Sequence, residues 1–505
     1  MLILITIHAR ILSRLNDRGF KNPRMEDQYL TPEPLVSSSV SRHKATLFLS
    51  SATFAASKTW RLLLLVSLGM LSLGGLSTIK VWWTGIGLWG ENISVNWAWD
   101  ITNFVWWIGI GHAGTLISAI LLLFRARWRN SVNRIAETVT LCALMSSAFF
   151  ILVHLGRPWV AHWIFPFKNT YGSLWVNFNS PLVWDAFAIL TYFLVSLVYW
   201  YLGLIPDFAL IRDRSTGLKK KVYAFLSFNF ENSAWIWRRV ESIMLILAGL
   251  ATALVVSVHS IVSFDFSATI IPGWHSTIFP PYFVIGAIFS GFAMVLTLMI
   301  PLRSLLKLHD YITIAHIEKM NLMLLLNSVL IGVAYMTEFF GAFYTGGEEL
   351  QLLYYRATGE YALMFWIMMI CNIILPQLLW IRNLRRSLLA TLVLSILINV
   401  GMWSERFLII ISSLSFDRLP SKWLPFSPTL HDLGVFVFSA GLFMSMFLVI
   451  IRYIPVVPIF EVKRLIRSDV TTAPDADEAV GSSTILPGRE TARTRKRKST
   501  VLKDA

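Results

Sequence analysis

The sequence predicts an all-α, polytopic membrane protein, and three observations lead to this fold class. Of the 505 residues, 55% are hydrophobic and only 14% are charged. Apolar runs repeatedly reach the roughly 20 residues that a helix needs to cross the hydrocarbon layer of a bilayer. The loops between these runs alternate between basic and weakly charged. We expect about ten transmembrane helices, near residues 60–82, 103–125, 134–156, 182–205, 240–263, 281–302, 317–342, 360–381, 387–409 and 431–453.

The two ends of the chain are expected to lie outside the membrane core. Residues 1–58 mix Ser, Pro and charged residues, and their short apolar start is neither a full span nor a signal peptide, so we expect a cytoplasmic arm. Residues 59–102 hold the first helix and an outer loop. Residues 416–456 hold the last helix with its preceding loop, and residues 457–505 are expected to form a disordered, basic cytoplasmic tail.

An internal repeat organises the chain between these ends. Four residues of the second predicted helix recur in related form, with the same spacing, in the sixth. This similarity predicts two parallel four-helix bundles, residues 103–266 and 267–415. Small residues that let helices approach closely would explain the similarity equally well. The matching residues are Ile108, Gly109, His112 and Gly114 in one helix and Ile285, Gly286, Phe289 and Gly291 in the other.

Loop charge predicts the orientation, because Lys and Arg are retained on the cytoplasmic side. Loops such as 125–129, 212–221 and 382–386 are basic, whereas loop 264–280 has no Lys or Arg and loop 343–359 has one. An even number of spans then places both termini in the cytoplasm. The net charge of +15 is therefore mostly an orientation signal, and nucleic-acid binding is not expected.

Ionisable residues gather at the predicted outer ends of the first bundle. His154 and Arg157 end the third helix, Asp185 begins the fourth and Asp265 follows the fifth, while His112 lies deeper in the second. Each has an ordinary explanation as a packing residue, a helix cap or a solvated loop acid. Together they favour a site, because charges within a membrane normally face a protein interior or a wet cavity.

The residue types suit a ligand that gives up protons. Quinol oxidation needs acceptors for two protons while two electrons leave, and a neutral His with a carboxylate can accept them. We therefore predict a quinol site with His154, Asp185 and Asp265 as its catalytic residues, and His112 and Arg157 as further binding residues.

Other cofactors are not expected within the chain. Cys142 and Cys371 both lie in apolar runs, without a metal-binding or haem-attachment motif, so any redox centre is non-covalent or belongs to a partner. For an intrinsic haem, His154 and His259 are the only plausible axial pair, near the outer edge. A secondary transporter remains an alternative, because parallel repeats with buried charge suit it too.

Four segments carry a resemblance to a known family. They are the stretches HLGRPW at 154–159, LWVNFNSPLVWD at 174–185, YLGLIPD at 201–207 and PGWHSTIFPPYF at 272–283. Over about residues 58–455 the chain resembles the NrfD/polysulfide reductase membrane subunits, and most of all the ActC-type subunit of bacterial alternative complex III.

The resemblance implies a function as one part of a respiratory complex in the bacterial cytoplasmic membrane. Quinol or menaquinol would be the bound substrate, oxidised at the periplasmic face. The expected partners are a periplasmic iron-sulfur subunit, a second NrfD-like membrane subunit and cytochromes c that carry haem c, so this chain would not be active alone. An anchor of a polysulfide- or nitrite-type reductase is the alternative. The resemblance also implies proton translocation, for which His259, Glu338, Glu405 and His431 are the candidates.

Overall fold

The computed structural model describes residues 34–472 except 38, 53–56, 165–177, 417–420 and 422. Within these residues it contains helices and no strands, and ten helical segments are long and apolar enough to span a membrane. Both the all-α class and the ten spans are therefore confirmed. The spans are α4 (Lys58–Thr84), α5 to α6 (Trp99–Leu123), α7 (Asn133–His154), α8 (Pro181–Asp213), α10 (Ala234–Ser267), α11 (Phe279–Leu305), α12 (Ile314–Thr345), α14 to η6 (Ala362–Trp380), α16 to α17 (Leu388–Ser415) and α18 (Leu430–Tyr453).

Hydroxyl side chains begin several of these spans. Ser57, Ser233, Ser387 and Thr429 each accept a hydrogen bond from a backbone N–H in the first turn of α4, α10, α16 and α18. Such caps satisfy amides that have no partner within the helix. At Thr429 the cap is reciprocal, because Asp432 accepts from the backbone N–H of Thr429.

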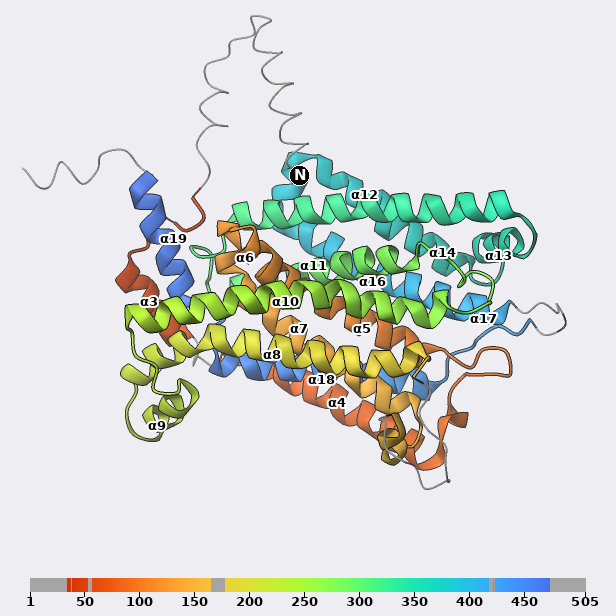
Figure 1. The fold of residues 1–505 in the computed structure, drawn as a ribbon, viewed down its shortest axis with the longest axis horizontal. Helices are drawn as coiled ribbons and strands as arrows, with labels where there is room; N and C mark the ends of the chain where they lie inside the picture. Colours follow the sequence, from red (N-terminus) through yellow and green to blue (C-terminus); the bar gives the residue numbers. More distant parts are fainter. Residues whose placement is uncertain are drawn as a thin grey trace, which may run out of the picture. The chain divides into compact units, whose positions relative to one another are not determined.

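The spans lie side by side in two groups (Figure 1). Helices α5, α7, α8 and α10 contact one another, and α11 contacts both α12 and α16, with α14 against α16. The groups meet where α5 crosses α11, and a Cβ on Gly109 would be in ordinary van der Waals contact with Ala287 and Ser290 of α11. The parallel relationship between the groups, and the domain boundaries given above, stay predictions.

The remaining two spans, α4 and α18, form a close pair. A Cβ on Gly74 would lie 2.4 Å from the backbone nitrogen of Phe438, and one on Gly441 would lie 2.6 Å from that of Leu71. Glycine is therefore required at both places, because any larger residue would separate the two backbones.

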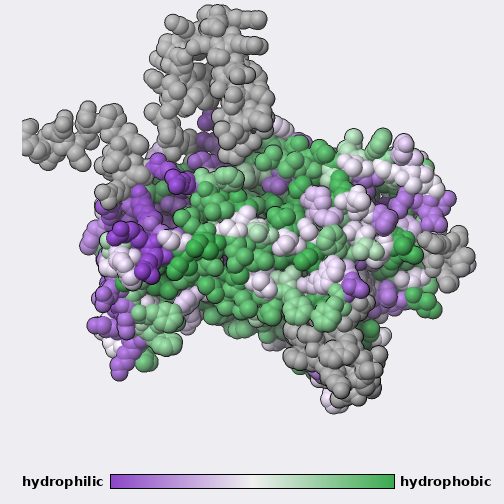
Figure 2. Space-filling view, viewed as in Figure 1, coloured by the Kyte–Doolittle hydropathy of each residue, from purple (hydrophilic) through white to green (hydrophobic). Residues whose placement is uncertain are grey.

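The polarity of the surface changes along the spans, from their middle to their ends. Apolar side chains cover their middle, and hydrophilic ones gather at the ends (Figure 2). At one end lie the connecting helices α3 (Arg42–Ala52), α9 (Gly217–Leu226) and α19 (Ile459–Thr472), and at the other lies α13 (Gly347–Thr358). We call the first the basic end, because the Arg- and Lys-rich loops belong to it. We call the other the outer end, because loop charge predicts that it faces away from the cytoplasm.

Ordered structure continues further into the C-terminal arm than the sequence predicts. Disorder is expected over residues 457–505, but α19 is helical, and Ile459, Val462 and Leu465 are buried along one face. Glu461 of this helix accepts hydrogen bonds from Asn133 and lies 3.4 Å from Arg129. The segment is polar overall, but its apolar residues recur about every three to four positions, so they form one apolar helix face that can be buried. The predictions for residues 1–33 and 473–505 lie outside the described residues.

Candidate functional site

Asp185 and Asp265 form a buried carboxyl pair at the outer end of the first group of helices. Asp185 lies in the second turn of α8 and Asp265 near the end of α10, with 4% and 8% of their surfaces exposed. The two carboxyl groups are within hydrogen-bonding reach of each other, and the Oδ1 atom of each has no hydrogen-bond partner in the described structure. A carboxylate can only accept, so a hydrogen bond between the two requires a proton on one of them.

His154 belongs to a second acid–base pair. Its Nδ1 atom hydrogen-bonds the carboxylate of Asp100, which lies in the first turn of α5 and is almost fully buried. Asp100 also accepts from the backbone N–H of Ala98 at 3.0 Å. A carboxylate that accepts from Nδ1–H fixes the histidine tautomer and leaves Nε2 as the acceptor. Sequence reasoning did not select Asp100, although an acid in the first turn of an apolar span was visible.

One aromatic ring contacts both His154 and the residue next to Asp265. The Trp97 ring packs edge-on against His154 on one side and against Phe266, the neighbour of Asp265, on the other, each with centroids 6.1 Å apart. Among the described residues His154 makes no hydrogen bond to either Asp185 or Asp265. Arg157 is exposed in the turn after α7. Residues 174–177 of the motif that leads to Asp185 lie outside the described residues.

His112 and His259 meet below this site. Their rings pack edge to face with centroids 4.7 Å apart, and both are fully buried. His112 Nδ1 lies 2.6 Å from the carbonyl oxygen of Ile108, and its ring stacks on Tyr192. Neither nitrogen of His259 has a hydrogen-bond partner in the part of the chain that the structure describes.

This contact corrects the position expected for His259. The sequence pairs it with His154 near the outer edge, but it lies six residues before Asp265, about 9 Å along the helix at 1.5 Å per residue. It therefore reaches the depth of His112. His259 therefore contacts His112 and does not lie beside His154, the partner that the sequence suggests for a haem, and the absence of an intrinsic haem stays a prediction.

A polar cluster continues from the histidines into the second group of helices. Phe283 lies between His259 and Arg406, whose guanidinium carbon is 4.1 Å from the centroid of the Phe283 ring. Arg406 Nη1 is 3.1 Å from Glu405, and Glu405 accepts a hydrogen bond from Tyr335. The guanidinium occupies the space left by Gly286, where a Cβ would lie 2.6 Å from Arg406 Nη2. The repeated glycine motif thus has a local purpose that the sequence did not reveal.

A model of the polysulphide reductase NrfD family matches residues 88–416, which is more than half of the chain. The chain belongs to the NrfD family. Among curated proteins it is similar to a putative dimethyl sulfoxide reductase membrane subunit from Halobacterium salinarum, with 25% identity over 249 residues. These residues are 47% of this chain and 53% of that protein, so the match spans about half the length of the relative.

The NrfD match includes most of the candidate residues. His112, His154, Asp185, His259 and Asp265 all lie within it, as do Glu338 and Glu405. His431 and the helices α4 and α18 lie outside it. His431 is in the first turn of α18, and its Nδ1 atom has no hydrogen-bond partner among the described residues.

Glu338 has a clear structural partner in this NrfD protein. Arg356 of α13 donates to it at 3.0 Å, and the same guanidinium donates to the hydroxyl groups of Ser412 and Ser413 at 2.8 Å. The one basic residue of loop 343–359 is therefore held at the outer end by a half-buried carboxylate.

Sequence reasoning also missed a charged cluster at the basic end of the first group. Arg134 Nη2 lies 3.4 Å from Asp207 and donates to the carbonyl oxygen of Gly203 at 2.8 Å, and its Nε is 3.7 Å from Glu137. All three charged side chains are buried. The signal was available, since Arg134 and Glu137 fall inside an expected span. No group of three or more potential metal ligands occurs within the described residues.

One outer-loop carboxyl group adjoins the His154–Asp100 pair. Burial, followed by the negative charges of Asp100 and Asp432, raises the pKa of Glu91 to about 9. Its Oε1 atom is buried without a hydrogen-bond partner in the described structure. The preceding residue, Gly90, donates its N–H to Asp432 at 3.0 Å, which holds the loop against α18. Glu91 is therefore neutral near neutral pH.

Proposed function

We propose that this protein is the quinone-interacting membrane subunit of a respiratory oxidoreductase complex and that it deprotonates quinol at the outer end of its first group of helices. The observation that carries the proposal is the buried Asp185–Asp265 carboxyl pair, in which neither Oδ1 atom has a hydrogen-bond partner among the described residues. Trp97, which contacts both His154 and Phe266, lies between this pair and the His154–Asp100 pair in the chain of contacts. Ionisable groups buried within a membrane protein cost free energy, so those that occur there usually have a function.

The proton stoichiometry of quinol oxidation fits two acid–base pairs. Quinol loses two protons and two electrons to become quinone. His154 can accept one proton at Nε2, and Asp100 stabilises the resulting imidazolium. A carboxylate of the Asp185–Asp265 pair can accept the second proton, and the proton can then be shared with the neighbouring carboxyl group. The electrons leave to an iron-sulfur cluster, which we assign to a partner protein over this end.

The buried polar residues below the site are proposed to conduct protons. His112 and His259 touch, and beyond the Phe283 ring, which carries no exchangeable proton itself, Arg406 pairs with Glu405, which accepts a hydrogen bond from Tyr335. Asn372 continues the row, donating to the Tyr335 hydroxyl at 3.0 Å. These polar side chains extend from the first group of helices into the second, as a proton path through both would require. Glu338 and His431 remain weaker candidates, because neither has a described contact with this row.

The electron acceptor is proposed from the relatives. The name of the Halobacterium salinarum protein favours a dimethyl sulfoxide-type reductase as the electron acceptor. The resemblance to alternative complex III favours transfer to cytochromes c instead. The same proton chemistry serves both. We propose the cytoplasmic membrane as the location, with both termini inside and a second NrfD-like subunit alongside in the alternative complex III arrangement.

Replacement of Asp185 by Asn in the assembled complex tests the proposal. Asparagine keeps the size of the side chain but cannot accept a proton, so we expect quinol oxidation to slow by about 100-fold or more. The measurement is quinol:acceptor turnover of the purified complex. Asp213→Asn is the matched control, because Asp213 ends the same helix, is largely exposed and lies at the basic end. Unchanged turnover in an assembled Asp185→Asn complex would remove the carboxyl pair from the mechanism.

A further inference from the structure

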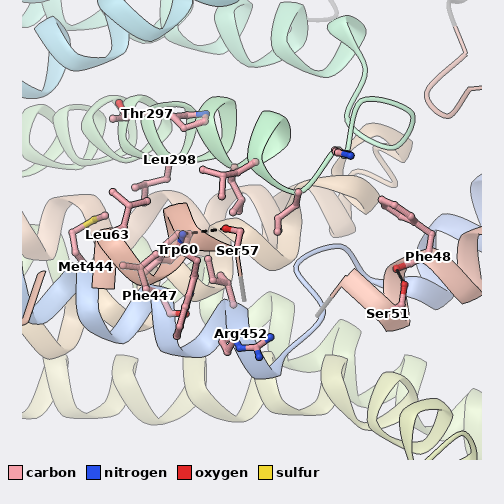
Figure 3. Close-up of a pocket in the computed structure, with 17 residues that line it drawn as sticks. Phe48, Ser51, Ser57, Trp60, Leu63, Thr297, Leu298, Met444, Phe447 and Arg452 are labelled. Carbon is pink, nitrogen blue, oxygen red and sulfur yellow. Dashed lines mark hydrogen bonds between the residues drawn. The ribbon is translucent and has the colours of Figure 1, made fainter. Parts of the chain in front are cut away.

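A second feature lies at the opposite, basic end of the molecule, away from the acid–base pairs. It is a cavity of about 710 Å³ between the ends of α4, α11 and α18, with α3 at its side (Figure 3). Its volume is within the roughly 300–1,000 Å³ of typical small-ligand sites. Two of its three main walls, α4 and α18, lie outside the NrfD match, so the cavity exists only because these helices are added to the family core.

The walls of the cavity are apolar and face the membrane. Leu63, Leu298, Met444 and Phe447 line it, together with further leucine side chains of α11. Helix α4 buries only four of its residues, so one side of the cavity is formed by a helix that is itself largely exposed. Such a surface suits a hydrocarbon chain that enters from the bilayer.

The cationic rim has no acidic counterpart. Lys307 and Arg452 are the charged residues that line the cavity, and no Asp or Glu is among its lining residues. The Nη1 atom of Arg452 is buried and has no hydrogen-bond partner in the described structure. Lys307 is exposed, and its positive φ of 54° ends α11 with a tight turn. Two cations therefore lie beside an apolar cavity that no described acidic residue lines.

The indole ring of Trp60 lies where the apolar part of the cavity meets its polar rim. Trp60 donates its Nε1–H to the carbonyl oxygen of Leu448, and the Arg452 guanidinium lies 5.6 Å from the centroid of the Trp60 ring. Ser57 caps the first turn of α4 directly beside it (Figure 3). Tryptophan and arginine at one level are typical of the boundary between hydrocarbon and lipid headgroups. The cavity thus spans from the headgroup level into the hydrocarbon.

We propose that this cavity binds an anionic glycerophospholipid. Its phosphate would lie between Arg452 and Lys307, and one acyl chain would lie between α4, α11 and α18. Basic pockets between helices on the cytoplasmic side are suited to anionic headgroups. A quinone fits less well, because the lining has no carboxylate or imidazole to exchange protons with its ring oxygens. The lipid would join the added α4–α18 pair to α11.

Photochemical cross-linking tests the proposal. The full chain, purified with its partners, is placed in nanodiscs of phosphatidylcholine that contain a small fraction of photoactivatable phosphatidylglycerol. We expect labelled peptides from residues 57–63, 297–307 and 444–452. The double variant Arg452→Gln/Lys307→Gln should reduce this labelling by roughly tenfold, because each basic residue contributes to binding of an anionic lipid.

Two controls separate charge from shape. Lys220→Gln/Lys221→Gln removes two exposed charges of α9 at the same end and should leave the labelling unchanged. Leu298→Trp fills the cavity and should reduce labelling by phosphatidylglycerol and by a matching phosphatidylcholine probe alike. Full phosphatidylglycerol labelling in the Arg452/Lys307 variant would overturn the proposal. So would displacement of the lipid probe by a photoreactive quinone that labels the same peptides.

Discussion

The partners of individual side chains decide what the outer site can do. His154, Asp185 and Asp265 are not one converging triad, because His154 is held by Asp100 and the two aspartates hold each other. In each pair, one side chain holds the other in position, and the other can exchange a proton. Under the proposed function, the two protons that leave one quinol would therefore have two separate destinations.

Asp100 acts through His154, and a double-mutant cycle can show this. Asp100→Asn should slow quinol oxidation by about 100-fold, because the imidazole loses both its fixed tautomer and the charge that stabilises its protonated form. His154→Gln should have a similar effect. If the two form one unit, the double variant will be no slower than the slower single variant. Multiplied effects would instead mean that Asp100 and His154 act independently.

Glu91 makes stability depend on pH. Its pKa rises from an ordinary 4.5 to about 9 in the folded protein, so the folded state binds this proton more tightly than the unfolded state. The stability from this group is complete below about pH 4.5 and is lost as the pH rises towards about 9. Glu91→Gln should therefore raise the unfolding midpoint over wild type at about pH 8, with a smaller difference at about pH 5.

Thermal unfolding of the detergent-purified complex at the two pH values measures this difference. Glu360→Gln is the control, because Glu360 is an exposed carboxylate in another outer loop. It should not change the midpoint at either pH. A Glu91→Gln effect of equal size at both pH values would contradict an origin in the proton of Glu91.

At the scale of helices, local π-turns accompany the buried polar residues. The turns Leu116–Ile120, Ile370–Ile374 and Leu408–Ser412 interrupt three spans, following His112, containing Asn372 and following Arg406. One extra residue in a turn re-aims the side chains around it and leaves backbone groups for new partners, and such turns are frequent at functional sites. The carbonyl oxygen of Asn372 indeed accepts from the hydroxyl group of Ser328. Hydropathy patterns do not contain this information, because a π-turn changes no residue type.

Glycine spacing sets how closely α5 approaches α7. A Cβ at Gly114 would lie 2.0 Å from the carbonyl oxygen of Ala136 and from Thr140 Oγ1, so Gly114→Ala must separate the helices. We expect a loss of about 1–3 kcal/mol in unfolding free energy, as for other overpacked cores. Gly249→Ala on α10 has no atom within 4 Å of the new Cβ and should be neutral or stabilising by up to about 1 kcal/mol. Denaturant or thermal unfolding of both variants gives the comparison, and equal effects would contradict the close approach.

At the scale of the whole molecule, the sequence predicted the fold class and the number of spans, because both depend on the summed hydropathy of many residues. Each span was found because about twenty residues contribute to its hydropathy. Boundaries were less accurate: α8 continues to Asp213, eight residues beyond the expected 205, because charged residues at a helix end still form helical hydrogen bonds. The types of site residue were predicted from chemistry. Asp100, the partner of His154, was not predicted, since a contact between residues 54 positions apart in sequence depends on packing.

The orientation of the whole molecule determines where protons from the site are released. The basic loops predict that the end with α3, α9 and α19 is cytoplasmic, so the Asp185–Asp265 pair would face the opposite side. Single cysteines can test this, because the native Cys142 and Cys371 are buried. Thr277→Cys in the outer loop and Lys220→Cys in α9 both occupy exposed positions.

A membrane-impermeant maleimide should label Thr277→Cys in intact cells or spheroplasts and should label Lys220→Cys only after permeabilisation. The wild-type chain, with its two buried cysteines, is the background control. The reverse pattern would place the acid–base pairs on the cytoplasmic side. Quinol oxidation there would release protons inward, and the proposed docking of a periplasmic iron-sulfur protein over this end would be wrong.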